Sequence, residues 1–145
     1  MTKTIQFGDE EVQFSTAFAW CFIYKSQFGA DPAKIVIPAI RKVYATTAGD
    51  ENEEENDEMA NERAFALFEE IGFVGIVQIA WAMAKLCDRT IPDPLTWISK
   101  YGDSIPTLDL VTELFPDIIE SCFTTKKADS PIPAPKEPGK KSTSK

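Results

Sequence analysis

The side chains that usually carry out catalysis are scarce in this chain. Histidine is absent from all 145 residues, which removes the most common general base, proton shuttle and metal ligand. No Ser-His or Cys-His pair is therefore available to activate a nucleophile. The chain also lacks the patterns GxGxxG and GxxxxGK[ST], in which backbone N–H groups hold phosphates. The residue types thus favour a binding protein over an enzyme.

Three cysteines and several adjacent carboxylates remain as candidates for chemistry. Cys21, Cys87 and Cys122 lie far apart in apolar stretches and form no CxxC pair. We therefore predict three reduced thiols in the core and neither metal nor redox chemistry. Glu69 and Glu70 are neighbours, and neighbouring residues on a helix point in different directions, so they do not form an acid–base couple.

The segment GDENEEENDE at 49–58 is a dense acidic run. Asp50, Asn52 and Glu54 have the alternate spacing of calcium ligands, but Glu55 stands where an EF-hand loop needs glycine. We predict a solvated acidic loop at about 48–58 that binds no metal. No other motif implies a cofactor.

Charge divides the chain near residue 125. Residues 126–145 hold six lysines against Asp129 and Glu137, so they carry +4, and residues 1–125 carry −12 of the total of −8. We expect 1–125 to form one folded domain and the Pro-, Lys- and Ser-rich segment 126–145 to be a disordered tail. A pI near 4.6 argues against nucleic acid and anionic membranes as direct partners, because both attract clustered Lys and Arg.

Two further features predict a cytoplasmic protein. The first residues, MTKTIQFGDEEVQ, lack the apolar run of a signal peptide. The most apolar stretch, from Ile71 to Ala84, is shorter than the roughly 20 residues that a bilayer requires. We therefore expect that stretch to belong to a buried core helix.

Hydrophobic periodicity predicts a mainly α fold, a compact bundle of about five helices with a small N-terminal β-hairpin. Apolar residues alternate at 5, 7, 12 and 14 around Gly8-Asp9, as in two strands joined by a short turn. Ser15 is the expected N-cap of the first helix, and Gly29 its left-handed end. The expected helices span 15–28, 32–43, 59–87, 93–102 and 107–123. The helix at 59–87 is the candidate central helix.

Aromatic residues are numerous, with three Trp, three Tyr and ten Phe. The segment 16–24 is apolar on most sides, so we expect a helix there that is either central or covered by a partner. Trp and Tyr are enriched at protein interfaces. The candidate interface residues are Phe18, Trp20, Phe22, Tyr24, Trp81 and Trp97. The sequence leaves open which of them belong to the core.

In three blocks the chain resembles the tail assembly chaperones of long-tailed (siphovirus-type) bacteriophages. The first block is a short N-terminal hairpin leading into a helix that ends in YKSQFGADP (24–32), and the second is a helix that ends in IVQIAWAMAKLCD (76–88). The third is IPDPLTWISKYGD (91–103) followed by an apolar last helix, LVTELFPDIIESCF (110–123). The successive patterns YxxxFG, WAxAK and PDPxxW carry the resemblance. Together the blocks cover most of residues 5–123.

The resemblance implies a non-catalytic protein that acts in the host cytoplasm and is absent from the mature virion. In the family, a programmed ribosomal frameshift yields a longer form beside the short one. Both forms bind the tape measure protein, and the extension recruits tail tube subunits. We also expect self-association. Lysine pairs can be encoded by A-rich slippery heptamers, so either Lys126-Lys127 or Lys140-Lys141 is a hypothetical frameshift site, which the gene sequence would test.

Two other non-enzymatic functions compete with this interpretation. An acidic phage protein can mimic DNA and block a restriction enzyme, but a mimic spreads its carboxylates over one long surface. Here ten of the twenty-one acidic residues in 1–125 lie between Asp50 and Glu70. A minor structural tail protein is the other alternative, and mass spectrometry of purified virions would distinguish it from a chaperone.

Overall fold

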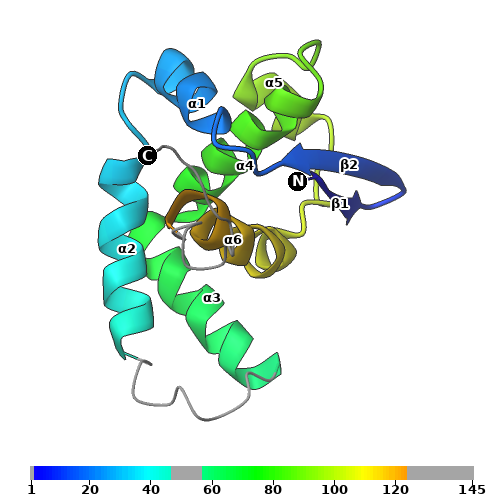
Figure 1. Ribbon diagram of the computed structural model, residues 1–145. Coiled ribbons are helices and arrows are strands. Elements are labelled where there is room, and N and C mark those ends of the chain that lie inside the picture. Colours follow the sequence, from blue (N-terminus) through cyan, green and yellow to red (C-terminus); the bar gives the residue numbers. More distant parts are fainter. Residues whose placement is uncertain (1, 47–56, 124–145) are drawn as a thin grey trace, which may run out of the picture.

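A computed structural model describes residues 2–46 and 57–123 (Figure 1). Within these ranges two antiparallel strands precede six helices, so the predicted mainly α fold with an N-terminal hairpin is confirmed. Five of the helices have nine or more residues, and the remaining one, Pro94–Ser99, has six. The predicted tail at 126–145 and all but the last two residues of the predicted acidic loop at 48–58 lie outside the described residues.

The hairpin forms where the alternating apolar residues predicted it. Strand β1 spans Thr2–Phe7 and strand β2 spans Glu10–Ser15, with Ile5 opposite Val12. One face of the pair is buried, because a strand turns every second side chain to the same side. Gly8 has a φ of 64° in the turn, and a Cβ there would lie 2.9 Å from the Ser104 hydroxyl oxygen. The turn therefore favours glycine on two grounds.

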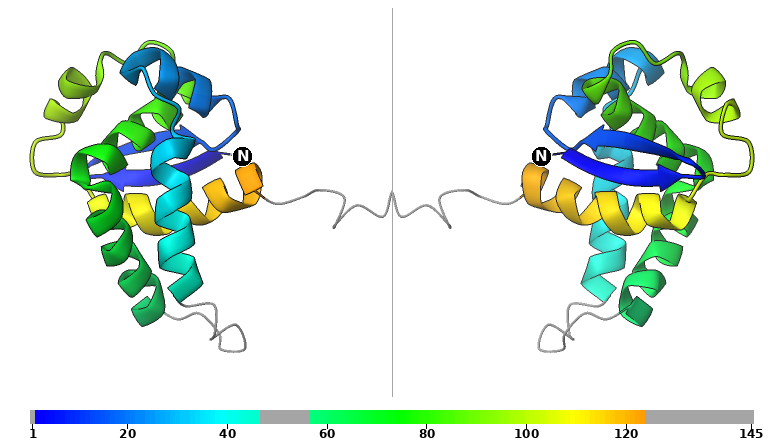
Figure 2. Two further views of the ribbon diagram at one scale, coloured as in Figure 1. Left: turned by 90° about the vertical axis from the view of Figure 1, so that its left-hand side faces the viewer. Right: turned by 90° about the vertical axis from the view of Figure 1, so that its right-hand side faces the viewer.

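The helices surround a central one. In order they are α1 (Trp20–Phe28), α2 (Ala33–Thr46), α3 (Asp57–Ile71), α4 (Phe73–Cys87), α5 (Pro94–Ser99) and α6 (Thr107–Phe123). Helix α4 packs against β2 and against α1, α3, α5 and α6. Its residues from 79 to 84 are all buried. Helices α2 and α3 lie side by side, while α6 runs alongside the hairpin (Figure 2).

The prediction of one continuous helix at 59–87 was wrong. Helix α3 ends at Ile71, and α4 begins at Phe73 with its axis turned by 100°. Gly72 makes this bend with φ 90° and ψ 158°, a conformation that residues with a Cβ rarely adopt. Among the described residues, no single helix is long and apolar enough to cross a bilayer. Helices α3 and α4 have the required length and composition only as this bent pair.

The expected N-cap at Ser15 was also wrong. Ser15 is the last residue of β2, where it pairs with Thr2, so the chain is still extended there. A turn follows, in which the Trp20 N–H donates to the Ala17 carbonyl oxygen at 3.0 Å, and α1 begins only at Trp20. The end of α1 is as predicted. Gly29 has a φ of 83°, and its N–H donates to the Lys25 carbonyl oxygen at 2.8 Å.

Four aromatic side chains form a closed cluster between the hairpin and α5. Phe7 lies 5.9 Å from Phe14, 6.0 Å from Trp97 and 4.9 Å from Tyr101, measured between ring centroids. We call these four residues, Phe7, Phe14, Trp97 and Tyr101, the closed aromatic cluster.

The start of α5 is as the Asp-Pro pair predicted. Asp93 caps the helix by accepting a hydrogen bond from the backbone N–H of Thr96 at 3.1 Å.

Candidate functional site

Side chains of α1, α2 and α6 and of the segments before α1 and α2 line an apolar groove of about 310 Å³. Three of the phenylalanines in the lining are exposed, with Phe22 71% exposed, Phe18 56% exposed and Phe123 43% exposed. Other apolar side chains in the lining include Trp20, Val36, Ile37 and Ile118. We call this feature the α1–α2–α6 groove. It is the candidate functional site.

The spacing of aromatic residues on α1 explains which of them reach the groove. Trp20 and Tyr24 lie four residues apart on one face of α1, and both are buried. Phe28 continues this row, 4.7 Å from the Tyr24 ring and 5.8 Å from the Trp81 ring. The row fastens α1 to the central helix, and it leaves the other side of α1 uncovered.

The structure places four of the six candidate interface residues in the core. Trp20, Tyr24, Trp81 and Trp97 are each at most 3% exposed. The indole N–H of Trp81 donates to the Pro92 carbonyl oxygen at 2.8 Å, which satisfies it inside the protein. These four side chains pack between elements of the same chain, and of the four only Trp20 also lines the groove. The predicted interface at these positions therefore needs correction.

The other two candidates, Phe18 and Phe22, lie on the surface. Their rings are 6.3 Å apart in an edge-to-face arrangement on the uncovered side of α1. Phe18 belongs to the turn before α1, so the late start of the helix brings it beside Phe22. The candidate interface thus narrows to this pair and to the groove side chains around it.

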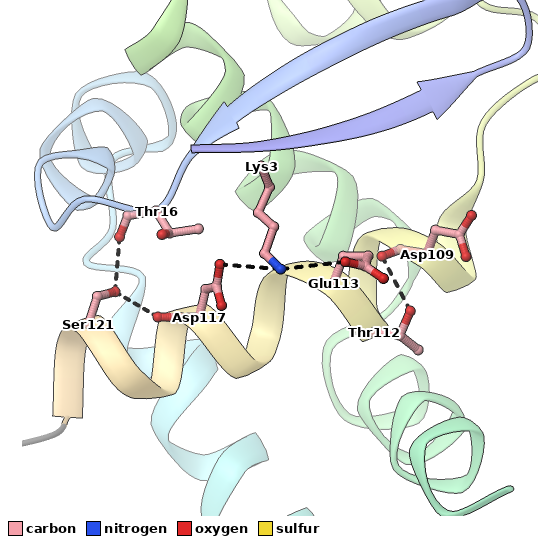
Figure 3. A network of polar contacts seen from close by, with 7 residues as sticks. All are labelled: Lys3, Thr16, Asp109, Thr112, Glu113, Asp117 and Ser121. Carbon is pink, nitrogen blue, oxygen red and sulfur yellow. Dashed lines mark hydrogen bonds and ion pairs between the residues drawn. The ribbon is translucent and has the colours of Figure 1, made fainter. Parts of the chain in front are cut away.

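Polar contacts hold α6 in the position that closes one side of the groove (Figure 3). The Lys3 ammonium lies 3.5 Å from the Glu113 carboxylate and 3.8 Å from that of Asp117. The Ser121 hydroxyl shares its proton between the Thr16 carbonyl oxygen at 2.9 Å and the Asp117 carbonyl oxygen at 2.8 Å. These contacts tie the last turns of α6 to the hairpin and to the segment before α1.

Two of the three cysteines meet in the groove. Cys21 on α1 and Cys122 on α6 both line it and are partly exposed, whereas Cys87 is exposed at the end of α4. The prediction of three core thiols therefore needs correction. The Cys21 thiol donates a hydrogen bond to the Cys122 sulfur and so lowers the pKa of Cys122 to about 6. The same bond retains the proton of Cys21 and raises its pKa.

The sequence missed two sets of exposed apolar residues. Ile37 and Phe123 belong to the groove lining, although they were not among the candidate interface residues. Phe65, Phe73 and Val74 are exposed on either side of the Gly72 bend, in the region expected to form one central helix. The signal available in the sequence was Gly72 itself, since glycine is the residue type that adopts the positive φ observed at this bend.

The lining of the α1–α2–α6 groove is mostly apolar. Lys25 and Asp31 are the charged residues among its lining. Among residues 2–46 and 57–123, no group of three His, Cys, Asp or Glu side chains is placed to hold a metal ion. What the groove offers is apolar area, much of it aromatic, with one charge of each sign. No protein-family model, curated protein or solved structure matches this chain.

Proposed function

We propose that this protein is a tail assembly chaperone that binds a helical segment of the tape measure protein in the α1–α2–α6 groove and catalyses no reaction. The observation that carries the proposal is the open aromatic lining of the groove. Burying apolar surface gains about 25 cal/mol per Å², so side chains as large as Phe18 and Phe22 stabilise any complex that covers them. The resemblance to the phage chaperones identifies the kind of polypeptide that would do so.

The walls of the groove favour a helix as the occupant. All three walls are helices or helix ends, and amphipathic helices bind such surfaces by placing side chains at positions i, i+3, i+4 and i+7 in the groove. The side chains of Lys25 and Asp31 line the same groove and are exposed. They offer pairing for charged residues that flank the apolar face of the client.

The charge of the chain fits the handling of an apolar client. Residues 1–125 carry −12, and like charge keeps complexes apart in solution. A long apolar helix bound to such a protein would stay dispersed until it assembles. In this proposal a frameshifted longer form recruits tail tube subunits, the chaperone self-associates in the host cytoplasm, and neither form remains in the virion.

The decisive experiment is co-expression with the tape measure protein encoded beside it. The wild-type chain should bring that protein into the soluble fraction and co-purify with it. Phe22→Asp should abolish this effect, because a carboxylate in the groove opposes apolar contact. Leu95→Asp on α5 is the matched control, since Leu95 is 72% exposed and lies outside the groove lining. The control should behave as wild type.

Two results would contradict the proposal. One is a tape measure protein that stays insoluble with the wild-type chain. The other is equal loss of client binding in both variants, which would place the contact elsewhere. Circular dichroism of the purified variants verifies that each is folded. Mass spectrometry of purified virions provides an independent test, because a chaperone should be missing from them and a structural tail protein should be present.

A further inference from the structure

The α1–α2–α6 groove contains a pair of thiols that has no part in the proposed binding of a helix. Cys21 comes from α1 and Cys122 from the last turn of α6, and both are free thiols that line the groove. Both residues are partly exposed where they line the groove, so we expect a small solute in the groove to reach them. The two side chains also interact, since each shifts the ionisation of the other.

The surroundings give the two thiols different chemistry. The hydrogen bond from Cys21 lowers the pKa of Cys122 and so favours its thiolate. Cys21 keeps its proton, and the negative charge of Asp31 opposes its ionisation further. Cys122 is thus the nucleophile that attacks the peroxide, and Cys21 is the thiol that attacks the oxidised Cys122 sulfur afterwards.

We propose that Cys21 and Cys122 form an oxidisable dithiol that reacts with a small hydroperoxide and reversibly ties α1 to α6 across the groove. The proposal requires no metal and no bound cofactor. Its two parts are one free thiol on α1 and one on α6, which line the same groove and are both partly exposed.

The reaction balances in two steps. The Cys122 thiol first releases its proton to solvent, and its thiolate then attacks one oxygen of hydrogen peroxide. An S–O bond forms, the O–O bond breaks, and the leaving hydroxide combines with the released proton to give water. The Cys21 thiol then loses its proton and its sulfur attacks the Cys122 sulfur, which expels the hydroxyl group as water. The peroxide is reduced to two waters, and two thiols are oxidised to one disulfide. A dithiol reductant reverses the bond by exchange.

The disulfide would change the groove directly. It replaces two thiols in the lining by a covalent link between two of its three walls, so α1 and α6 lose freedom to separate. We therefore expect oxidation to alter the affinity of the groove for a helix. This consequence rests on the proposed function, whereas the thiol chemistry itself does not.

The test measures thiols without any client. Dilute hydrogen peroxide is added to the full-length chain, and the loss of free thiols is followed with time. Wild type and Cys87→Ser should each lose two thiols, and digestion without reductant should yield a linked peptide pair containing Cys21 and Cys122. Cys122→Ser should slow the loss at least about tenfold, because the thiolate is the reactive form. Cys21→Ser should stop at a sulfenic acid on Cys122, which a cyclic dione traps.

Any of three outcomes would overturn the proposal. The first is an unchanged rate of thiol loss in Cys122→Ser, with Cys122→Ala and circular dichroism used to verify that the fold is kept. The second is a main product that contains Cys87, which is exposed and serves as the internal reference. The third concerns the unfolded chain. In guanidinium chloride the Cys21–Cys122 link should form more slowly than in the folded chain. An equal rate there would show that the fold does not bring the thiols together.

Discussion

The closed aromatic cluster and the α1–α2–α6 groove use the same kind of side chain with opposite results. In the cluster, Phe7, Phe14 and Trp97 come from three elements and each is at most 2% exposed. In the groove, Phe18 and Phe22 are packed against each other and remain more than half exposed. The difference lies in what covers these side chains. Trp97 of α5 packs on Phe7 and Phe14 of the hairpin, whereas no described element covers Phe18 and Phe22 beside α1.

This contrast shows that aromatic content alone does not identify an interface. Both regions read as apolar in the sequence, and the tryptophans that most resembled interface residues are all buried. An apolar surface becomes a candidate for binding when the chain supplies two or three walls and no cover. The groove satisfies that condition, and the closed aromatic cluster does not.

The largest effect should come from opening the closed aromatic cluster. Trp97→Ala removes a side chain that is 2% exposed and contacts the rings of Phe7, Phe14 and Tyr101. We expect it to lower the free energy of unfolding by about 3–5 kcal/mol, from lost burial and the cavity left behind. Denaturation by urea measures this loss. A variant as stable as wild type would mean that the cluster is not a structural core.

A smaller loss of stability is expected from a substitution at Gly72, in the bend between α3 and α4 on which both regions depend. Gly72→Ala forces a Cβ into a backbone with φ 90° and ψ 158°, and no nearby atom blocks the added methyl group. The cost is therefore backbone strain of about 1–3 kcal/mol. Because α4 contacts both the hairpin and α1, amide exchange should increase in both regions together. An increase confined to one region would contradict a shared dependence on α4.

The Asp93 cap at the start of α5 should contribute less to the free energy of unfolding than Gly72 does. Its contribution should also depend on pH. Asp93 accepts hydrogen bonds from the Thr96 hydroxyl at 2.7 Å and from the Thr96 N–H, and these lower the pKa of Asp93 below its ordinary 3.8. A lowered pKa in the folded state stabilises the fold above about pH 3.8, and this gain is lost as the pH falls through the folded value.

The variant Asp93→Asn keeps the shape of the cap but cannot ionise. Urea unfolding at pH 7 should therefore show it to be less stable than wild type, by less than Gly72→Ala. The difference should be smaller at pH 3, because below the ordinary pKa of 3.8 the unfolded chain takes up the proton more readily than the folded chain. A difference that stays constant between these two pH values would show that the charge of Asp93 does not matter.

The smallest effect on stability is expected in the groove. Phe22→Ser should change the free energy of unfolding by no more than about 0.5 kcal/mol, because Phe22 is 71% exposed. Leu95→Ser, at 72% exposure on α5, is the matched control. Both are measured by urea denaturation beside Trp97→Ala. If Phe22→Ser approached the loss of Trp97→Ala, the two regions would not differ in the way that the exposures indicate.

Much of the local structure followed from the sequence alone. Alternating apolar residues predicted the hairpin and its turn at Gly8, Gly29 predicted the end of α1, and Asp93 predicted the cap of α5. Each of these features depends on residues a few positions apart. Helical periodicity likewise predicted the start of α6 at Thr107. Backbone preferences and capping act over such short distances, so the sequence states them directly.

The candidate site was decided by packing between distant parts of the chain. Apolar spacing continues through Gly72 without a break, so the 100° turn between α3 and α4 was invisible to periodicity. Only the docking of α1 on α4 buries Trp20 and leaves Phe22 outside. Only the meeting of α1 with α6 brings Cys21 to Cys122. Such outcomes depend on which faces of separate elements cover one another, and residue spacing within a single element carries no record of that choice.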